Sequence, residues 1–176
     1  MKHELREPFT KEKLATLKAG DSVLLTGTIY AARDAAHEKL VRMMEQGETL
    51  PIDLRDQIIF YAGPTPAKEG YPIGSVGPTT SYKMDPFTPA FLERGLSGMI
   101  GKGPRSDAVK ECARKNGAVY FAAIGGTAAL MAQSVQSAEA AAFAEMGDNA
   151  VLRLQVKGLP VIVANDASGG DIIAGK

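Results

Sequence analysis

The stretch DSVLLTGTIYAARDAAHEKLVRMMEQG, residues 21–47, places a strand pattern directly before a helix pattern. Residues 21–30 form a short apolar run that ends at a Gly-containing turn, which predicts a buried strand. Residues 34–47 carry apolar side chains at helical spacing, with Gly47 as the stop signal. Asp34 is a candidate N-cap for this helix. A strand that leads into a helix predicts an α/β fold.

More strand patterns follow towards the C-terminus. Short apolar runs bounded by Gly or Pro predict strands at 57–63, 97–103 and 118–126. Residues 151–166, VLRLQVKGLPVIVAND, predict two strands around Lys157–Gly158.

Helix patterns alternate irregularly with these strands. They lie at 87–95, 106–117 and 127–147. The second has Ser106 as a cap and Gly117 as a stop, and the third predicts one or two Ala-rich helices. Residues 63–77 are rich in Gly and Pro and predict a long loop, a feature that in compact domains is more often functional than idle. We therefore expect a layered α/β domain with a mixed sheet.

Length and composition indicate one ordinary globular domain. The chain has 176 residues and a formal net charge of zero, so nothing indicates a nucleic-acid or membrane partner. We expect a single domain over 1–176, with 1–18 as a peripheral N-terminal arm. The charged N-terminus lacks the apolar run of a signal peptide, and no stretch approaches the roughly 20 apolar residues of a membrane span. With one cysteine and no internal disulfide, a cytoplasmic location is expected.

The stretch VGPTTSYKMDPF, residues 76–87, sets two hydroxyls in front of a cation. Thr79 and Thr80 offer hydroxyls beside backbone N–H groups, and Lys83 adds a compact positive charge. Together these groups suit a carboxylate. The alternative is a loop in which the threonines cap a helix and the lysine is solvated.

The motif ARDAAH, residues 32–37, lies at the mouth of the first predicted helix. The guanidinium of Arg33 matches a carboxylate bidentately, and helix N-terminal N–H groups favour an anion there. His37 lies one turn further on and can face the same pocket. The alternative places Arg33 in a surface salt bridge and leaves His37 as a half-buried polar residue.

Two glycine turns offer further backbone sites. In IGKGPRS, residues 100–106, Lys102 lies between two glycines, which allow the backbone to approach a ligand. The pattern is neither a Walker A loop nor a dinucleotide fingerprint, and a turn with a solvated lysine is the alternative. The stretch AIGGTAAL, residues 123–130, predicts either an anion nest or a close strand-to-helix turn.

The sequence lacks the ligands for a metal centre. Cys112 is the one cysteine and lies on a predicted helix, where it suits a small core position. Zinc and iron–sulfur sites need about three or four protein ligands. We therefore expect no metal site built from this chain.

The order and spacing of the motifs resemble a known family. The segments TGTIYAARDAAHEKL, FYAGPTP, SVGPTTSYKMDPF, MIGKG, VYFAAIGGTAAL and LPVIVANDASGGD together resemble the β subunit of class I, iron–sulfur-dependent fumarate hydratases, relatives of the L-tartrate dehydratase β subunit. The resemblance runs from about Gly20 to Ile173. It implies a swivelling β/β/α domain, and a partner α subunit whose cysteines hold a 4Fe–4S cluster. The implied reaction is the reversible hydration of fumarate to L-malate.

The resemblance also implies roles for individual residues. Arg33 matches the family's arginine for a substrate carboxylate, and Lys102 matches a substrate-binding lysine. Thr79 matches the hydroxyl that acts at the carbon-bound proton, with Thr80 beside it in the pocket.

Three further positions belong to the same motifs. His37 and Asp34 are candidates for an orienting role only. Lys83 stands where the family usually has arginine, so the charge is kept and the planar fork is lost. This departure bears directly on substrate identity and affinity.

Two other functions remain open from the sequence. A dehydratase β subunit for tartrate or another hydroxy-dicarboxylate is the alternative among enzymes. A stand-alone anion-binding or regulatory domain is the alternative from another class. For the enzyme, we expect a homodimer or a heterotetramer with the α subunit, and no activity from this chain alone.

Overall fold

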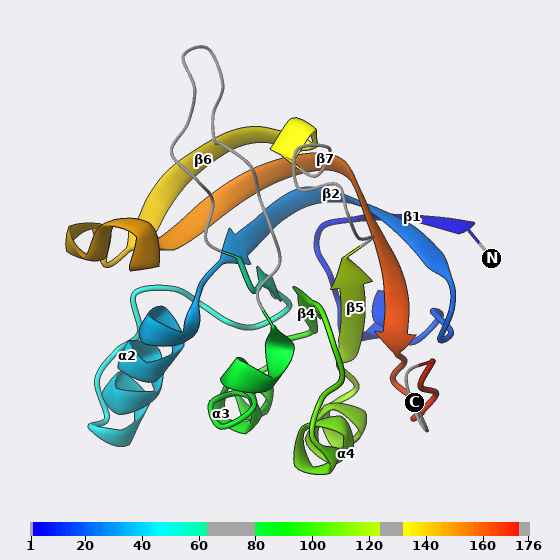
Figure 1. The fold of residues 1–176 in the computed structure, drawn as a ribbon, viewed down its shortest axis with the longest axis horizontal. Coiled ribbons are helices and arrows are strands. Elements are labelled where there is room, and N and C mark those ends of the chain that lie inside the picture. The colour runs from blue at the N-terminus through cyan, green and yellow to red at the C-terminus, as the bar shows by residue number, and fades with distance from the viewer. Residues whose placement is uncertain (1, 63–79, 124–131, 173–176) are drawn as a thin grey trace.

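The computed structural model describes residues 2–62, 80–123 and 132–172, which form one mixed sheet with helices packed against it (Figure 1). The strands are β1 (Lys2–Arg6), β2 (Ser22–Ala31), β3 (Ile58–Phe60), β4 (Gly98–Gly101), β5 (Val119–Ala123), β6 (Val135–Ala142) and β7 (Val151–Asn165). The α-helices are α1 (Lys11–Leu14), α2 (Asp34–Glu45), α3 (Thr88–Glu93) and α4 (Asp107–Asn116). The 3₁₀ helices are η1 (Ser81–Met84) and η2 (Ala144–Asn149). An α/β class with a mixed sheet is confirmed.

The sheet closes on itself through β7. Strands β1 to β5 run parallel in the order β1-β2-β3-β4-β5. β7 pairs antiparallel with β5 and also with β2, so β2, β3, β4, β5 and β7 form a barrel-like ring. β6 pairs antiparallel with residues 151–156 of β7, whereas β5 pairs with residues 161–165. The long strand β7 therefore closes the ring by joining β2 to β5.

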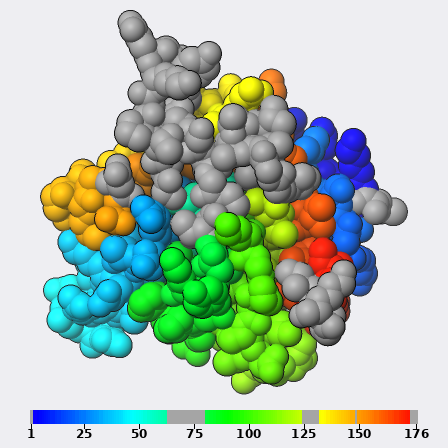
Figure 2. All heavy atoms as spheres, viewed as in Figure 1, coloured from blue at the N-terminus to red at the C-terminus, as the bar shows by residue number. Residues whose placement is uncertain are grey.

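Both faces of the short central strands are buried. Because side chains alternate across a strand, Ile58 and Phe60 lie in one apolar cluster, and Ile59 and Tyr61 lie in the other. The second cluster includes the inward faces of α2, α3 and α4, which lie together below the sheet in Figure 1. Figure 2 shows these helices covering the lower part of the molecule. Double burial explains why the strands read as continuous apolar runs.

Helix α4 follows the sequence prediction closely. The Ser106 hydroxyl accepts a hydrogen bond from the Val109 N–H at 3.2 Å. Gly117 ends the helix with φ of +68°, a conformation that glycine adopts without steric cost.

Helix α2 corrects one detail. Arg33 occupies the N-cap position without a side-chain capping bond, and Asp34 is the first helical residue. The prediction that Asp34 caps the helix was wrong. Its carboxylate in the first turn still complements the positive end of the helix dipole.

The Ala-rich segment differs from the prediction of one or two helices at 127–147. Residues 135–142 form the strand β6, where helix was expected, and residues 124–131 lie outside the described residues. The high helix propensity of alanine is a weak preference, and pairing with β7 overrides it.

Strand β7 is continuous where two strands were expected. Leu25 pairs with Leu159 and Gly27 pairs with Val156, so two residues of β7 oppose one residue of β2 in a bulge. Gly158 lies in this bulge and has a φ of +65°, a conformation that glycine adopts without steric cost. The Lys157–Gly158 step thus bends one strand instead of separating two.

The N-terminal segment is integral to the domain, so the expected peripheral arm was wrong. β1 pairs in register with the first half of β2, from Lys2 opposite Ser22 onwards. Phe9, Leu14 and Leu17 are almost fully buried in the core. Among the described residues, no helix has the length and apolar character needed to cross a membrane.

Candidate functional site

The candidate residues follow the carboxyl ends of parallel strands. Arg33 comes two residues after the end of β2, and Lys102 comes directly after β4. Thr80 forms an isolated parallel bridge with Lys102, so it lies at the same edge. Ligands of parallel α/β sheets bind at this edge, because loops after neighbouring strands converge there. Thr79 and most of residues 123–130 lie outside the described residues.

The Thr80 and Lys102 segments are packed tightly together. The Ser81 N–H donates to the Lys102 carbonyl at 3.0 Å. A Cβ on Gly101 would lie 2.1 Å from the Ser81 Oγ and 2.8 Å from the Tyr61 ring. Gly101 is therefore needed for this junction between segments, where the sequence suggested a close approach to ligand.

The side chains at this junction remain available for binding. Thr80 occupies the N-cap position of η1, but its hydroxyl makes no capping hydrogen bond. Lys83, on η1, and Lys102 are both exposed, and neither has an ion-pair partner in the described part of the chain. The structure thus brings together Thr80 and Lys102, with Lys83 one short turn away.

Arg33 has a buried donor for which the described residues provide no acceptor. Its Nε atom is inaccessible to solvent and lacks a hydrogen-bond partner within residues 2–62, 80–123 and 132–172. No salt bridge to Arg33 is formed by these residues either, which argues against the surface ion pair. Buried polar groups are nearly always satisfied, so an unpaired donor at a strand-end edge suits a ligand.

His37 is a buried, neutral neighbour of Arg33. Its Nδ1–H donates to the Arg33 carbonyl at 2.7 Å, since a carbonyl can only accept. The ring stacks on Phe91 at 4.8 Å and meets Tyr61 edge-on at 5.4 Å. Burial lowers the pKa of His37 to about 4, so the ring is uncharged at neutral pH. Its Nε2 is then an acceptor, again without a partner among the described residues.

A buried ion pair supports the junction, and the sequence did not reveal it. The Arg105 Nε donates to Asp85 at 2.8 Å, and the Ser106 N–H donates to the other oxygen of this carboxylate at 2.8 Å. The Arg105 Nη2 also donates to the Tyr61 hydroxyl at 3.1 Å and to Thr88 at 2.9 Å. Asp85 and Arg105 lie within the MDPF and GKGPRS motifs, but only the fold shows that they pair.

Tyr120 completes this buried network. Its hydroxyl donates to the Gly103 carbonyl at 2.8 Å and lies 2.6 Å from the Ser81 Oγ. Because the tyrosine proton is committed to Gly103, the serine hydroxyl is the donor of the second bond. Burial raises the pKa of Tyr120 to about 12, which keeps the phenol protonated.

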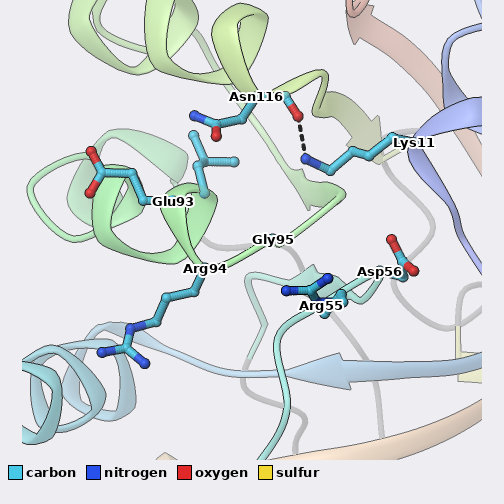
Figure 3. Close-up of a pocket in the computed structure, with 8 residues that line it drawn as sticks. Lys11, Arg55, Asp56, Glu93, Arg94, Gly95 and Asn116 are labelled. Atoms are coloured by element: carbon cyan, nitrogen blue, oxygen red, sulfur yellow. Dashed lines mark hydrogen bonds between the residues drawn. The ribbon is translucent and has the colours of Figure 1, made fainter. Parts of the chain in front are cut away.

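A separate hollow of about 330 Å³ lies at the opposite end of β4 (Figure 3). Arg94 and Gly95 line it before β4 begins, and Asn116 lines it after α4 ends. Lys11 reaches across it to donate to the Asn116 carbonyl. The hollow contains none of the residues that the sequence singled out.

The described residues do not assemble a metal centre. They contain no group of three or more His, Cys, Asp and Glu side chains placed to hold an ion. Cys112 is half-buried against the helix-facing cluster, and burial raises the pKa of its thiol. The side chains in the described ranges therefore do not fit an iron–sulfur cluster.

Comparison with known proteins relates the whole chain to one family. Residues 1–175 match the model of the family described as Fumarase C-terminus. The chain is 38% identical to fumarate hydratase 2 of Leishmania major and 39% identical to the anaerobic class I fumarate hydratase of Escherichia coli K12. These matches cover 98% and 97% of this chain, and 31% and 32% of the relatives. The chain therefore spans about a third of the length of these enzymes.

One relative is similar in length. The chain is 40% identical to the putative L(+)-tartrate dehydratase subunit beta of Methanocaldococcus jannaschii. That match covers 93% of this chain and 87% of the relative.

Proposed function

The chain belongs to the fumarase C-terminus family, and on that premise we propose that it is the β subunit of an iron–sulfur-dependent hydro-lyase. The proposed reaction is the reversible hydration of fumarate to L-malate. The β subunit supplies residues that bind substrate carboxylates and a threonine for proton transfer, and it acts as a swivelling domain in a cytoplasmic enzyme.

The unpaired Nε of Arg33 is the observation that carries this proposal. It is a buried donor at the same strand-end edge as Thr80 and Lys102. The two parts of the edge are connected through Tyr61, which contacts the His37 ring and accepts from Arg105. A carboxylate at Arg33 satisfies a donor that is otherwise costly to bury.

The charges suit the proposed chemistry. Removing a proton next to a carboxylate builds negative charge on that carboxylate, so fixed cations stabilise the transition state there. Arg33 and Lys102 supply such cations, with Lys83 nearby. Thr79 is the proposed proton-transfer group, and because a hydroxyl is a weak base it needs a neighbour to take its proton.

The cluster and most of the enzyme are assigned to a partner. This chain has one cysteine, whereas a 4Fe–4S cluster needs about three or four protein ligands. The fumarate hydratases that match are about three times longer, whereas the Methanocaldococcus relative is named as a separate beta subunit. We therefore place the cluster in a cysteine-bearing α subunit, in a homodimeric or heterotetrameric assembly.

A tartrate dehydratase subunit is the second candidate. Lys83 stands where the family motif usually has arginine, and lysine presents a point charge without the planar fork. A 40% identical relative is named as a putative L(+)-tartrate dehydratase subunit. Both observations concern which dicarboxylate is bound, and they leave the reaction class unchanged.

The direct test is reconstitution. We expect the chain alone to be folded, colourless and inert, and the complex made by anaerobic co-expression with a cysteine-bearing α subunit to hydrate fumarate. Assays should cover fumarate, malate and tartrate. Iron–sulfur absorbance or hydration by the purified chain alone contradicts the division between subunits. Dicarboxylate binding by a chain that forms no active complex supports the anion-binding domain.

A further inference from the structure

Arg105 is a charged side chain buried where several segments meet. Only 1% of its side chain is exposed. Besides its bonds to Asp85, Tyr61 and Thr88, its guanidinium carbon lies 4.8 Å from the centre of the Tyr120 ring. One guanidinium thus contacts the end of η1, the start of α3, the end of β3 and the strand β5.

Stability alone is a poor explanation for this ion pair. Desolvating two charges costs about as much as their attraction returns, and apolar replacements of buried pairs are often neutral or stabilising. The best-attested use of such pairs is to fix one arrangement among several. The fork of Arg105 suits that use, because separate N–H groups hold Asp85, Tyr61 and Thr88 at fixed angles.

The segments that Arg105 joins are those that carry the site. Asp85 directly follows η1, which bears Lys83 and begins next to Thr80. Arg105 itself lies in the loop after β4, three residues beyond Lys102. Apart from the Arg105 side chain, the described hydrogen bonds between these segments are the Ser81–Lys102 bond, the Ser106–Asp85 bond and the Ser81–Tyr120–Gly103 chain.

We propose that Arg105 is a positioning residue that holds Thr80 and Lys102 in register at the substrate site. This role rests on the proposed function for its catalytic consequence. Its structural consequence, a rigid junction between the two segments, holds for the chain by itself. Arg105 touches no substrate, and it acts through Asp85 on one segment and through its own loop on the other.

Amide hydrogen exchange on the full chain tests the structural part. Arg105→Lys keeps the charge but cannot reach Asp85, Tyr61 and Thr88 together. We expect the Ser81 and Ser106 amides to exchange at least about tenfold faster, because their acceptors are released. The Val163 amide, which donates to Asp21, is the internal reference and should not change. Arg153→Lys, which alters the exposed pair with Glu139, is the matched control variant.

Kinetics of the assembled enzyme test the catalytic part. Arg105→Lys should raise KM and lower kcat, because misplaced Lys102 binds more weakly and misplaced Thr80 disturbs the pocket. A role in folding alone reduces the active fraction, which lowers kcat and leaves KM unchanged. If Arg105→Lys does not fold, Tyr61→Phe removes one acceptor and should give smaller shifts in the same direction.

The outcomes separate this inference from the proposed function. Wild-type exchange at Ser81 in Arg105→Lys, or faster exchange with an unchanged KM, overturns the positioning role. A wild-type complex that hydrates no dicarboxylate overturns the proposed function instead. The exchange measurement still decides in that case whether Arg105 fixes the junction.

Discussion

The two ends of β4 both carry positive charge, but they use it differently. At the strand's beginning, the hollow is lined by Lys11, Arg55 and Arg94, with carboxylates of Asp56 and Glu93 among them. Lys11 already donates to a backbone carbonyl there. At the strand's carboxyl end, Asp85 is committed to the buried Arg105, whereas the buried Nε of Arg33 has no acceptor among the described residues.

The comparison shows that an empty volume is a weaker guide than an unsatisfied atom. A hollow edged with exposed charges of both signs is solvated and stable without a ligand. A buried donor without a partner carries a desolvation cost that binding can relieve. The strand-end edge is therefore the better site, although it is not the hollow drawn in Figure 3.

Thr79→Val should give the largest contrast between the site edge and the rest of the molecule. The change preserves shape and removes the hydroxyl proposed for proton transfer, so kcat should fall by about 10²-fold or more while KM changes little. Steady-state kinetics of the assembled enzyme measure both. Thr49→Val, at an exposed threonine, is the control. A raised KM with unchanged kcat means that Thr79 only binds substrate.

Arg33→Ala directly tests the difference between the two ends of the parallel strands. Loss of a charge-assisted hydrogen bond of roughly 1.5–3 kcal/mol predicts a fall in kcat/KM of roughly 10- to 100-fold. Lys102→Ala should behave similarly. The matched control is Arg94→Ala in the hollow, which should stay within about twofold of wild type. Equal losses in Arg33→Ala and Arg94→Ala remove the distinction between the two ends.

His37 predicts a pH dependence of stability at the site edge. Its pKa is about 4 in the folded chain and 6.5 unfolded, so the unfolded state binds more protons between these values. The contribution of His37 is complete above pH 6.5 and falls by about 1.4 kcal/mol per pH unit on acidification towards pH 4. Urea unfolding of wild type and His37→Gln between about pH 4.5 and 7, which covers most of this window, measures the difference.

His3→Gln supplies the reference for that experiment. His3 is paired with Asp21 and lies near the N-terminus, before all the candidate site residues in the sequence. Stability should depend less steeply on pH in His37→Gln than in wild type across this window. Identical slopes in wild type and His37→Gln show that the ring is not buried in its neutral form.

Lys83→Arg should have the smallest effect and sharpen the substrate assignment. If lysine stands in for the usual arginine, restoring the fork should keep activity or lower the KM for fumarate by no more than about threefold. If the site is fitted to tartrate, the larger planar group should lower activity on that substrate. The assay is kcat/KM for malate, tartrate and fumarate, and no change on any of them places Lys83 outside the pocket.

Local signals in the sequence were sufficient for several elements. The cap at Ser106 and the stop at Gly117 bound α4 as predicted, because each depends on its own φ/ψ angles and a bond three residues away. The strand at 21–30 matches β2, whose bounds are Ser22–Ala31. The sequence also placed Arg33 at the start of α2, since helical periodicity begins immediately after it.

Other features depend on partners that are distant along the chain. The Ala-rich run is a strand because β7 offers it a ladder of hydrogen bonds, which alanine's helix preference cannot match. The ring closes because β7 pairs with both β2 and β5. The local sequence of β7 does not indicate either partner. Such pairings are decided by burial and register over the whole sheet.

The sequence by itself determined the family pattern, the α/β class and the candidate residues for the site. Only the tertiary structure decided which of these residues meet: Thr80 beside Lys102, and His37 under Arg33. It also supplied the Asp85–Arg105 pair, whose members are 20 positions apart. The physical reason is that capping and periodicity are properties of neighbours in the chain, whereas burial, charge pairing and the absence of a partner are properties of neighbours in space.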